Sequence, residues 1–302
     1  HPVSGSEPGT WSLSAALGIR RGDIVSFVGG GGKTTALFRL GDALAELGWR
    51  VIETTTTHIN REESGLASRH LVCRCPGQSD AEILEVLHPG APLLITGPLT
   101  ENERRWSGVP SEWISGWTCK PVGADAVLVE ADGSRGLPFK APAAHEPVIP
   151  YRTTLLVPVL GINAVGHPIA QVTHRPEQIA ALTGLPTSAT LTPEVIATVV
   201  RHPAGGLKGC PPSARVRVLV NKVHSASDHD NAREIALGLI CPAGAVGAVI
   251  IGAVATDHPV HAVYRPVAAV VLAAGQSLRM DSTVPKQLLP WHGRTVIEQI
   301  VD

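Results

Sequence analysis

The sequence is poor in aromatic residues and cysteines, and it has no long apolar run. Only 4% of its 302 residues are aromatic, and its five cysteines are scattered along the chain. No stretch approaches the roughly 20 uninterrupted apolar residues that a membrane-spanning helix needs. A scattered, odd set of cysteines does not make a disulfide framework, which favours reduced thiols and a cytoplasmic location. The opening residues HPVSGSEPGT also lack the basic and apolar segments of a signal peptide.

Neither sign of charge is in excess. Lys and Arg number 25 against 26 for Asp and Glu, which gives a net charge of -1 and a pI near 7.0. Because nucleic-acid-binding proteins normally carry a basic stripe or a high pI, we expect neither nucleic acid nor a membrane as a partner. Hydrophobic residues, in contrast, make up 44% of the chain and can form a sizeable core.

Short apolar runs alternate with helical patterns along most of the chain. This alternation is typical of βα units and predicts an α/β fold with a mostly parallel sheet and flanking helices. Residues 99–123 contain three of the six tryptophans and are expected to form an insertion or a lid. The predicted strands cover residues 23–29, 50–54, 93–96, 125–133, 154–159, 215–220 and 246–251. The predicted helices cover residues 33–47, 79–87, 175–183, 193–201 and 231–239.

The strongest functional signal is FVGGGGKTT, residues 27–35, between a predicted strand and a predicted helix. Glycines let consecutive backbone N–H groups curl around a phosphate. Lys33 would then reach the β- and γ-phosphates, and the Thr34 hydroxyl would ligate Mg²⁺. The spacing is closer to the xGGxGKTT form of metallochaperone GTPases and ParA-like ATPases than to GxxxxGK[ST], although Val28 replaces the additional lysine of some members. The residues expected to bind nucleotide here are Gly29, Gly30, Gly31, Gly32, Lys33, Thr34 and Thr35.

Two carboxylates, Glu130 and Asp132, follow the apolar run AVLV. Side chains at i and i+2 of an extended segment point to the same side, and ligands bind at the carboxyl edge of a parallel sheet. One carboxylate could hold the hydration shell of Mg²⁺ while the other orients or deprotonates the attacking water. We therefore expect Lys33, Glu130 and Asp132 to be catalytic. Which carboxylate has which role stays open.

Four threonines, residues 54–57, close the second predicted strand and precede His58. The β propensity of threonine is by itself a sufficient explanation of this run. At the active edge of the sheet, however, these hydroxyls could also meet Mg²⁺ or the γ-phosphate. The expected metal set is therefore Thr34, Asp132 and Thr57, and His58 is a weaker candidate for an acid or a base.

The sequence NKVH, residues 221–224, follows another predicted strand and is similar to the N-K-x-D motif that reads a nucleotide base. His224 stands where that motif has an aspartate, so its usual bonds to guanine are not available. We expect Asn221 and Lys222 to contact the base, with ATP or GTP bound together with Mg²⁺.

Together these motifs resemble the YqeC family, accessory proteins of selenium-dependent molybdenum hydroxylases. The resemblance covers about residues 12 to 260. It implies a P-loop NTPase-like fold and a role in maturing a molybdenum enzyme, with the molybdenum cofactor or a molybdenum hydroxylase as a partner. The segments that carry it are IVSFVGGGGKTT (24–35), TTTTHI (54–59), VLVEADGSRGLPFKAP (127–142), HEPVIP (145–150), GINAVG (161–166), HRPEQI (174–179) and NK (221–222). Within them, the polar candidates for a substrate or partner site are Lys140, His145, Glu146 and Arg175.

The last residues, 270–301, resemble the opening of a MobA-like nucleotidyltransferase, the group that contains molybdenum cofactor cytidylyltransferase. In that pattern LAAGxSxRM is a triphosphate loop, and Arg279 and Lys286 would neutralise phosphate charge. The acidic, metal-binding remainder of such a Rossmann-like domain is absent, so we expect a fusion that is cut short. The expected layout is a flexible N-terminus (1–11), a YqeC-like domain (12–262) and an incomplete transferase segment (263–302).

Three functions are compatible with these motifs. The first is Mg²⁺-dependent binding and slow hydrolysis of a nucleoside triphosphate, in support of maturation of, or cofactor insertion into, a selenium-dependent molybdenum hydroxylase. The second is cytidylyl transfer by the C-terminal module of the intact fusion. The third is a non-catalytic module whose bound nucleotide only locks a conformation that docks a partner.

Overall fold

A computed structural model describes residues 11–74, 78–101, 103–241 and 244–267, with residues 288, 290–291 and 294–295 of the C-terminal segment. The chain divides into two compact units, residues 1–265 and 266–302. In the second unit, β14 (Pro290–Trp291) pairs antiparallel with β15 (Arg294–Thr295). Arg279 and Lys286 lie outside the described residues, so the structure does not confirm a nucleotidyltransferase fragment.

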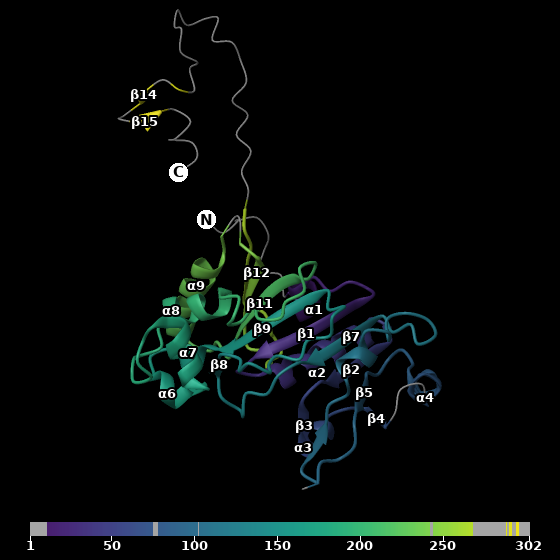
Figure 1. The fold of residues 1–302 in the computed structure, drawn as a ribbon. Helices are drawn as coiled ribbons and strands as arrows, with labels where there is room; N and C mark the ends of the chain where they lie inside the picture. The colour runs from purple at the N-terminus through teal and green to yellow at the C-terminus, as the bar shows by residue number, and fades with distance from the viewer. Residues whose placement is uncertain are drawn as a thin grey trace, which may run out of the picture. The chain divides into compact units, whose positions relative to one another are not determined.

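The first unit is built on one sheet, which has nine strands within the described residues in the order β13-β12-β11-β9-β1-β7-β2-β5-β4 (Figure 1). All neighbouring strands are parallel except β12 and β13. The expected mostly parallel α/β fold with flanking helices is confirmed. The strands are β1 (Asp23–Gly29), β2 (Val51–Thr55), β4 (Arg69–Val72), β5 (Leu93–Thr96), β7 (Ala126–Glu130), β9 (Leu155–Gly161), β11 (Arg215–Asn221), β12 (Val246–Ile251) and β13 (Ala262–Tyr264).

Helices cover both faces of this sheet because its central strands are apolar on both sides. On β1, Val25 and Phe27 pack with α1 and α2, whereas Ile24 and Val28 belong to the clusters on the opposite face. That opposite face is covered by α8 and α9 at one end and by α4 and α5 at the other. The helices are α1 (Leu13–Leu17), α2 (Lys33–Glu46), α3 (Arg61–Ser64), α4 (Gln78–Val86), α5 (Ser111–Ile114), α6 (Ile169–Val172), α7 (Pro176–Thr183), α8 (Pro193–Arg201) and α9 (Ala226–Leu239).

Two short strand pairs of the first unit, within the residues that the structure describes, lie outside the main sheet. β3 (His58–Asn60) pairs antiparallel with β6 (Arg105–Ser107). β8 (Phe139–Lys140) pairs parallel with β10 (Thr173–His174). The sequence did not predict these pairs, because two or three residues are too few to show the alternating pattern of a strand.

One predicted helix boundary is wrong. The helix expected over residues 231–239 begins five residues earlier, at Ala226. Its N-terminus is a capping box, in which the Ser225 hydroxyl accepts from the Asp228 N–H and the Asp228 carboxylate accepts from the Ser225 N–H. Apolar periodicity misses this polar first turn, whereas a capping-box search would find it.

The lid expected over residues 99–123 is wrong for its C-terminal half. Trp117 is 2% exposed and Ile114 is fully buried. Both belong to the core cluster that includes Ile52, Ile95 and Val127 of the main sheet. This half of the segment is therefore part of the core and cannot open without exposing it.

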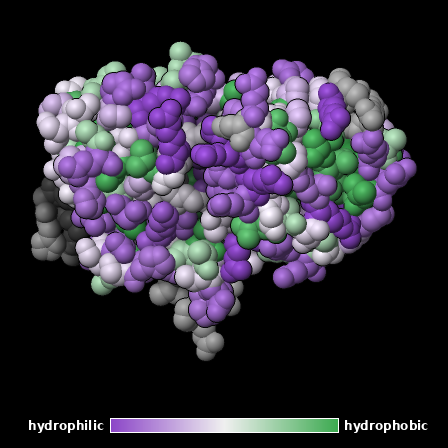
Figure 2. Space-filling model, turned by 90° about the horizontal axis from the view of Figure 1, so that it is seen from below, coloured by the Kyte–Doolittle hydropathy of each residue, from purple (hydrophilic) through white to green (hydrophobic). Residues whose placement is uncertain are grey.

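Hydrophilic residues cover most of the face of the molecule shown in Figure 2, with hydrophobic ones in smaller groups. Over the residues that the structure describes, no helix combines the length and apolar character needed to cross a bilayer.

The burial of Trp117 leads to a stability prediction. Replacing it by alanine removes a large side chain from the core, and we expect Trp117→Ala to lower the free energy of unfolding by about 3–5 kcal/mol. Urea unfolding followed by circular dichroism measures this change. The control is Trp11→Ala, at a tryptophan that is 46% exposed, where about 1 kcal/mol or less is expected. Equal effects of the two substitutions would contradict the core role.

Candidate functional site

The glycine-rich loop lies between β1 and α2, at the carboxyl edge of the sheet. Gly29, Gly31 and Gly32 have φ of +98°, +76° and +120°, a region that L residues other than glycine rarely adopt. Packing also requires glycine here, since a Cβ on Gly31 would lie 2.1 Å from the Gly161 nitrogen. The loop is therefore fixed by its neighbours as well as by its own backbone.

The N-terminus of α2 is open to an anion. Gly32 is its N-cap, no side chain caps the helix, and its first turn has no acidic residue. The first turn of a helix has backbone N–H groups without intrahelical partners, and the helix dipole adds positive potential there. With 14 residues, α2 is long enough for this effect. The arrangement is that of a phosphate-binding loop.

Lys33, the first residue of α2, turns back over the loop. Its Nζ donates to the Gly29 carbonyl at 2.8 Å and lies 3.3 Å from Asp132 and 3.5 Å from Glu130. Burial by itself would lower the pKa of Lys33, but the charges of Asp132 and Glu130 outweigh it, and the pKa is raised. The ammonium group therefore remains charged beside the loop.

The two carboxylates after β7 have different partners. Glu130 ends β7, and its Oε2 accepts from the Thr34 hydroxyl at 2.8 Å. Burial raises the pKa of Glu130, although Lys33 and Thr34 act against this shift. Asp132 accepts from the Gly29 N–H at 3.1 Å and contacts both Lys33 and Lys140. Glu130 is thus joined to the helix hydroxyl, whereas Asp132 is joined to the loop.

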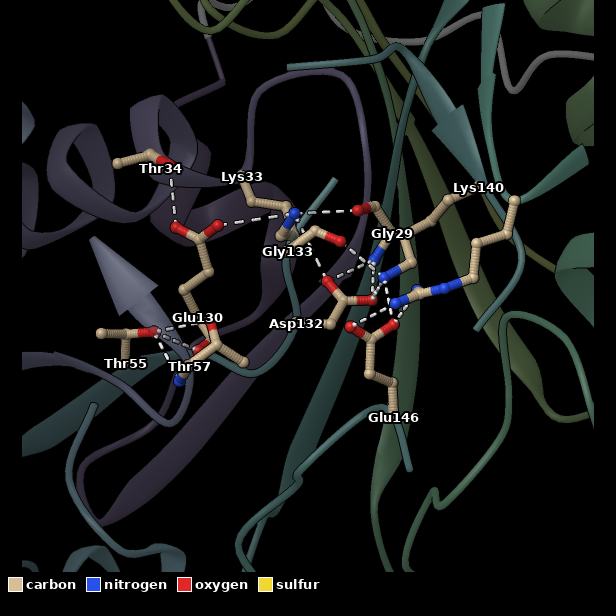
Figure 3. A network of polar contacts seen from close by, with 11 residues as sticks. Gly29, Lys33, Thr34, Thr55, Thr57, Glu130, Asp132, Gly133, Lys140 and Glu146 are labelled. Carbon is tan, nitrogen blue, oxygen red and sulfur yellow. Dashed lines mark hydrogen bonds and ion pairs between the residues drawn. The ribbon is translucent and has the colours of Figure 1, made fainter. Parts of the chain in front are cut away.

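A second buried lysine lies on the other side of Asp132. Lys140 Nζ is 3.1 Å from Asp132, 2.7 Å from Glu146 and 2.6 Å from the Gly133 carbonyl. The two lysine side chains converge on Asp132 (Figure 3). Arg175 in turn pairs with both oxygens of Glu146. Lys140, Glu146 and Arg175, three of the four polar candidates, therefore join one charged chain. The fourth, His145, lies on an exposed turn.

The threonine hydroxyls of residues 54–57 are mainly structural. Thr54 donates to the Ile95 carbonyl, Thr55 to the Glu130 carbonyl, and Thr56 to the Val148 carbonyl. The Thr57 hydroxyl lies 3.2 Å from that of Thr55, which places it near Glu130 (Figure 3). His58 is exposed on β3.

Asn221 lies behind the loop. Its Nδ2 donates to the Gly31 carbonyl at 2.9 Å, and its Oδ1 accepts from the Val254 N–H at 3.0 Å. The side chain is 3% exposed, so at most its second amide hydrogen is left for the base that we expected it to contact. Lys222 follows with φ +64°, a strained backbone for lysine. Its side chain is half-buried.

The sequence motifs did not predict two backbone contacts of the glycine loop. The Leu137 carbonyl accepts from the Gly31 N–H, and the Val159 carbonyl accepts from the Gly30 N–H. These contacts use backbone atoms, so side-chain motifs carry no signal for them. The one sequence feature that relates to these contacts is Gly161, a glycine at the point where the backbone after β9 passes close to the loop.

Fold and site together define a class: a parallel α/β protein with a glycine-rich loop between its central strand and the next helix, which is the arrangement of the P-loop motif. The chain belongs to the YqeC family. The model of this family, described as YqeC protein, matches residues 25–177. "Uncharacterized protein YqeC" of Escherichia coli (strain K12) is 35% identical over 211 residues, which are 67% of this chain and 77% of that protein.

Other comparisons concern the C-terminus and the fold. Residues 269–302 match a MobA-like NTP transferase domain. Among solved structures, the MinC:MinD cell division protein complex of Aquifex aeolicus has a TM-score of 0.42 and 15% identity, covering 76% of this chain and 81% of that chain. FtsY from Mycoplasma mycoides has a TM-score of 0.33 and 13% identity, covering 80% of this chain and 67% of that chain.

The charged chain at Glu146 leads to a pH prediction. Burial would raise the pKa of Glu146, but the bonds from Arg175 and Lys140 outweigh it and lower the pKa to about 2. A lowered pKa in the folded state stabilises the fold above the ordinary value of about 4.5, and this stability is lost as the pH falls toward 2. We expect Glu146→Gln to cost about 1–3 kcal/mol at pH 7 and progressively less below pH 4.5.

Guanidinium unfolding of both proteins at pH 7, 5 and 3 measures this difference. Glu234→Gln, at an exposed position of α9, is the control and should change little at any pH. A difference between Glu146→Gln and the parent that stays constant from pH 7 to pH 3 would contradict the charged pairing.

Proposed function

We propose that this protein binds a nucleoside triphosphate, ATP or GTP, on the loop of residues 29–35 and hydrolyses its terminal phosphate. The observation that supports this most directly is the buried ammonium group of Lys33, held over the Gly29 carbonyl next to an uncapped helix N-terminus. A buried, charged lysine and free helical N–H groups together fit the charge of a polyphosphate.

The residues present fit Mg²⁺ bound with the nucleotide. No group of three His, Cys, Asp or Glu side chains suited to a metal occurs in the described part of the chain. Mg²⁺ does not need such a group, because it is usually held by one or two protein oxygens together with substrate phosphates and water. Thr34 and Glu130, whose side chains are in contact, would hold it, with Thr57 nearby. The metal would supply charge neutralisation at the β- and γ-phosphates.

The contacts suggest a division of roles between the two carboxylates. Asp132 accepts from Gly29, Lys33 and Lys140, so little of its capacity to accept hydrogen bonds remains for a water molecule. Glu130 has fewer donors and a raised pKa, which suits a group that orients water or takes its proton. We therefore assign Glu130 to the metal and the water, and Asp132 to holding the loop and the two lysines.

The cellular role that we propose is support for maturation of, or cofactor insertion into, a selenium-dependent molybdenum hydroxylase. The similarity of residues 269–302 to a MobA-like NTP transferase domain supports the molybdenum context. It also favours a second candidate function, cytidylyl transfer by a protein that contains the whole of such a domain. Release of pyrophosphate from CTP in the presence of the molybdopterin cofactor tests this candidate.

Removal of the loop lysine tests nucleotide binding. We expect Lys33→Ala to weaken the affinity for ATP or GTP with Mg²⁺ by at least about 100-fold, because a buried charge-assisted bond to phosphate is lost. Isothermal titration calorimetry measures the affinity, and the melting temperature shows whether the variant is folded. Lys120→Ala, at an exposed lysine, is the control. An unchanged affinity in a folded Lys33→Ala variant would exclude this site.

The two carboxylates are expected to differ when each is replaced by its amide. Glu130→Gln should lower the rate of phosphate release by about 10²–10⁴-fold with little change in nucleotide affinity. Asp132→Asn removes one of the two carboxylate partners of each buried lysine and leaves Lys33 with Glu130 and Lys140 with Glu146. We therefore expect it to lower the free energy of unfolding by about 1–3 kcal/mol. Multiple-turnover phosphate release and urea unfolding measure the two effects. Full activity of Glu130→Gln would contradict the role assigned to Glu130, whereas a parent protein that binds nucleotide without releasing phosphate would support a non-catalytic module instead.

A further inference from the structure

The turn formed by residues 134–137 lies beside the phosphate loop. At its near end, Asp132 accepts from the Gly29 N–H. At its far end, the Leu137 carbonyl accepts from the Gly31 N–H at 3.1 Å, and the turn is closed by a bond from the Leu137 N–H to the Ser134 carbonyl at 3.1 Å. Because the chain is bonded to the loop both before the turn, at Asp132, and at its last residue, Leu137, the apex of the turn lies near the proposed phosphate site.

Arg135 occupies the apex in a strained conformation. Arg135 and Gly136 have φ of +52° and +76°, the two positive values of a type I′ turn, whose first position favours asparagine, aspartate or glycine. An arginine there is uncommon, and strained residues concentrate at functional sites.

Packing does not account for this arginine. Its side chain is exposed, and its guanidinium makes no hydrogen bond or ion pair with the described part of the chain. The pKa of His174 is lowered, first by burial and then by the charges of Arg175, Lys140 and Arg135. The charge of Arg135 therefore acts on the same region as the charges of Lys140 and Arg175.

The two buried lysines of the site share their charges with carboxylates. Lys33 contacts the Gly29 carbonyl, Glu130 and Asp132. Lys140 contacts the Gly133 carbonyl, Asp132 and Glu146. A bound triphosphate brings negative charge beyond what these paired lysines can balance, and Arg135 adds a cation beside the loop that has no ion pair within the described residues.

We propose that Arg135 contacts the terminal phosphate during hydrolysis and acts as an arginine finger supplied by the same chain. This inference rests on the proposed function. In the reaction, the bond between the γ-phosphorus and the β–γ bridging oxygen breaks, and a bond from the γ-phosphorus to the water oxygen forms. The proton of the water passes to Glu130 and then to the released phosphate. Arg135 balances the negative charge that develops on the bridging and γ-phosphate oxygens.

Three substitutions at Arg135 test the proposal. Arg135→Ala removes the guanidinium, Arg135→Lys keeps a charge without the planar fork, and Arg135→Asn places a residue that favours the turn. We expect Arg135→Ala and Arg135→Asn to lower kcat for phosphate release on the order of 10²-fold or more, while the dissociation constant for the nucleotide changes less than about threefold. Arg135→Lys should keep only part of the activity.

The melting temperature separates a catalytic role from a structural one. Arg135→Asn should melt at a higher temperature than the parent protein, because it relieves the strain of the turn, yet it should still lose activity. The matched control is Arg233→Ala, which removes an exposed arginine from α9 and should change neither quantity.

Binding of a transition-state mimic provides a readout without turnover. Aluminium fluoride should tighten the binding of the nucleoside diphosphate with Mg²⁺ to the parent protein at least about tenfold, and Arg135→Ala should abolish this gain. A kcat within twofold of the parent in Arg135→Asn, or an undiminished gain in Arg135→Ala, would overturn the proposal. If Lys33→Ala still abolishes nucleotide binding, the proposed function survives that result. If the parent protein binds no nucleotide, both fall together.

Discussion

The contacts of the Asp132 carboxylate hold the candidate site together. This one group receives the Gly29 N–H of the glycine loop and two buried ammonium groups, those of Lys33 and Lys140. Burial of a charge is costly unless the charge is paired and hydrogen-bonded. Each buried lysine is accordingly paired with this carboxylate and with one of its neighbours, Glu130 or Glu146. The loop, the lysines and the carboxylates form one electrostatic unit.

The strand order explains why these groups meet. β7 lies between β1 and β2, parallel to both, so that the ends of all three strands reach the same edge of the sheet. The glycine loop follows β1, the threonines follow β2, and Glu130 and Asp132 follow β7. Phe27 of β1 pairs in register with Glu130 of β7, which places the carboxylates opposite the start of the loop. A crossover sheet thus brings three distant segments into one site.

The chain beyond β7 also contributes residues to the site at the carboxyl edge of the sheet. After Asp132 it turns back over the glycine loop, then forms β8, where Lys140 lies in register with His174 of β10. Glu146 and Arg175 are brought to Lys140 from two further segments. These segments add Lys140, Glu146 and Arg175 to the charged groups that are joined to the loop through Asp132.

Much of the fold and the centre of the site could be predicted from the sequence, because apolar periodicity and glycine spacing are local properties. They located seven of the nine strands that the structure describes in the main sheet, α2, the loop lysine and the two carboxylates. They missed the strands β4 and β13, the short pairs β3–β6 and β8–β10, the capped start of α9 and the burial of Trp117. Each of these depends on contacts between distant residues or on a polar cap that periodicity does not detect.

The sequence by itself therefore determined which groups the site contains: a glycine loop, a lysine, hydroxyls and acidic residues. Only the tertiary structure decided which of them are paired. In the folded chain Glu130 accepts from Thr34, and Asp132 pairs with two lysines. Asn221 donates to the Gly31 carbonyl behind the loop, and Arg135 lies at the apex of a strained turn. The physical reason is that pairing in the interior depends on distances of about 3 Å across strands and loops, and a linear order of residues does not contain those distances.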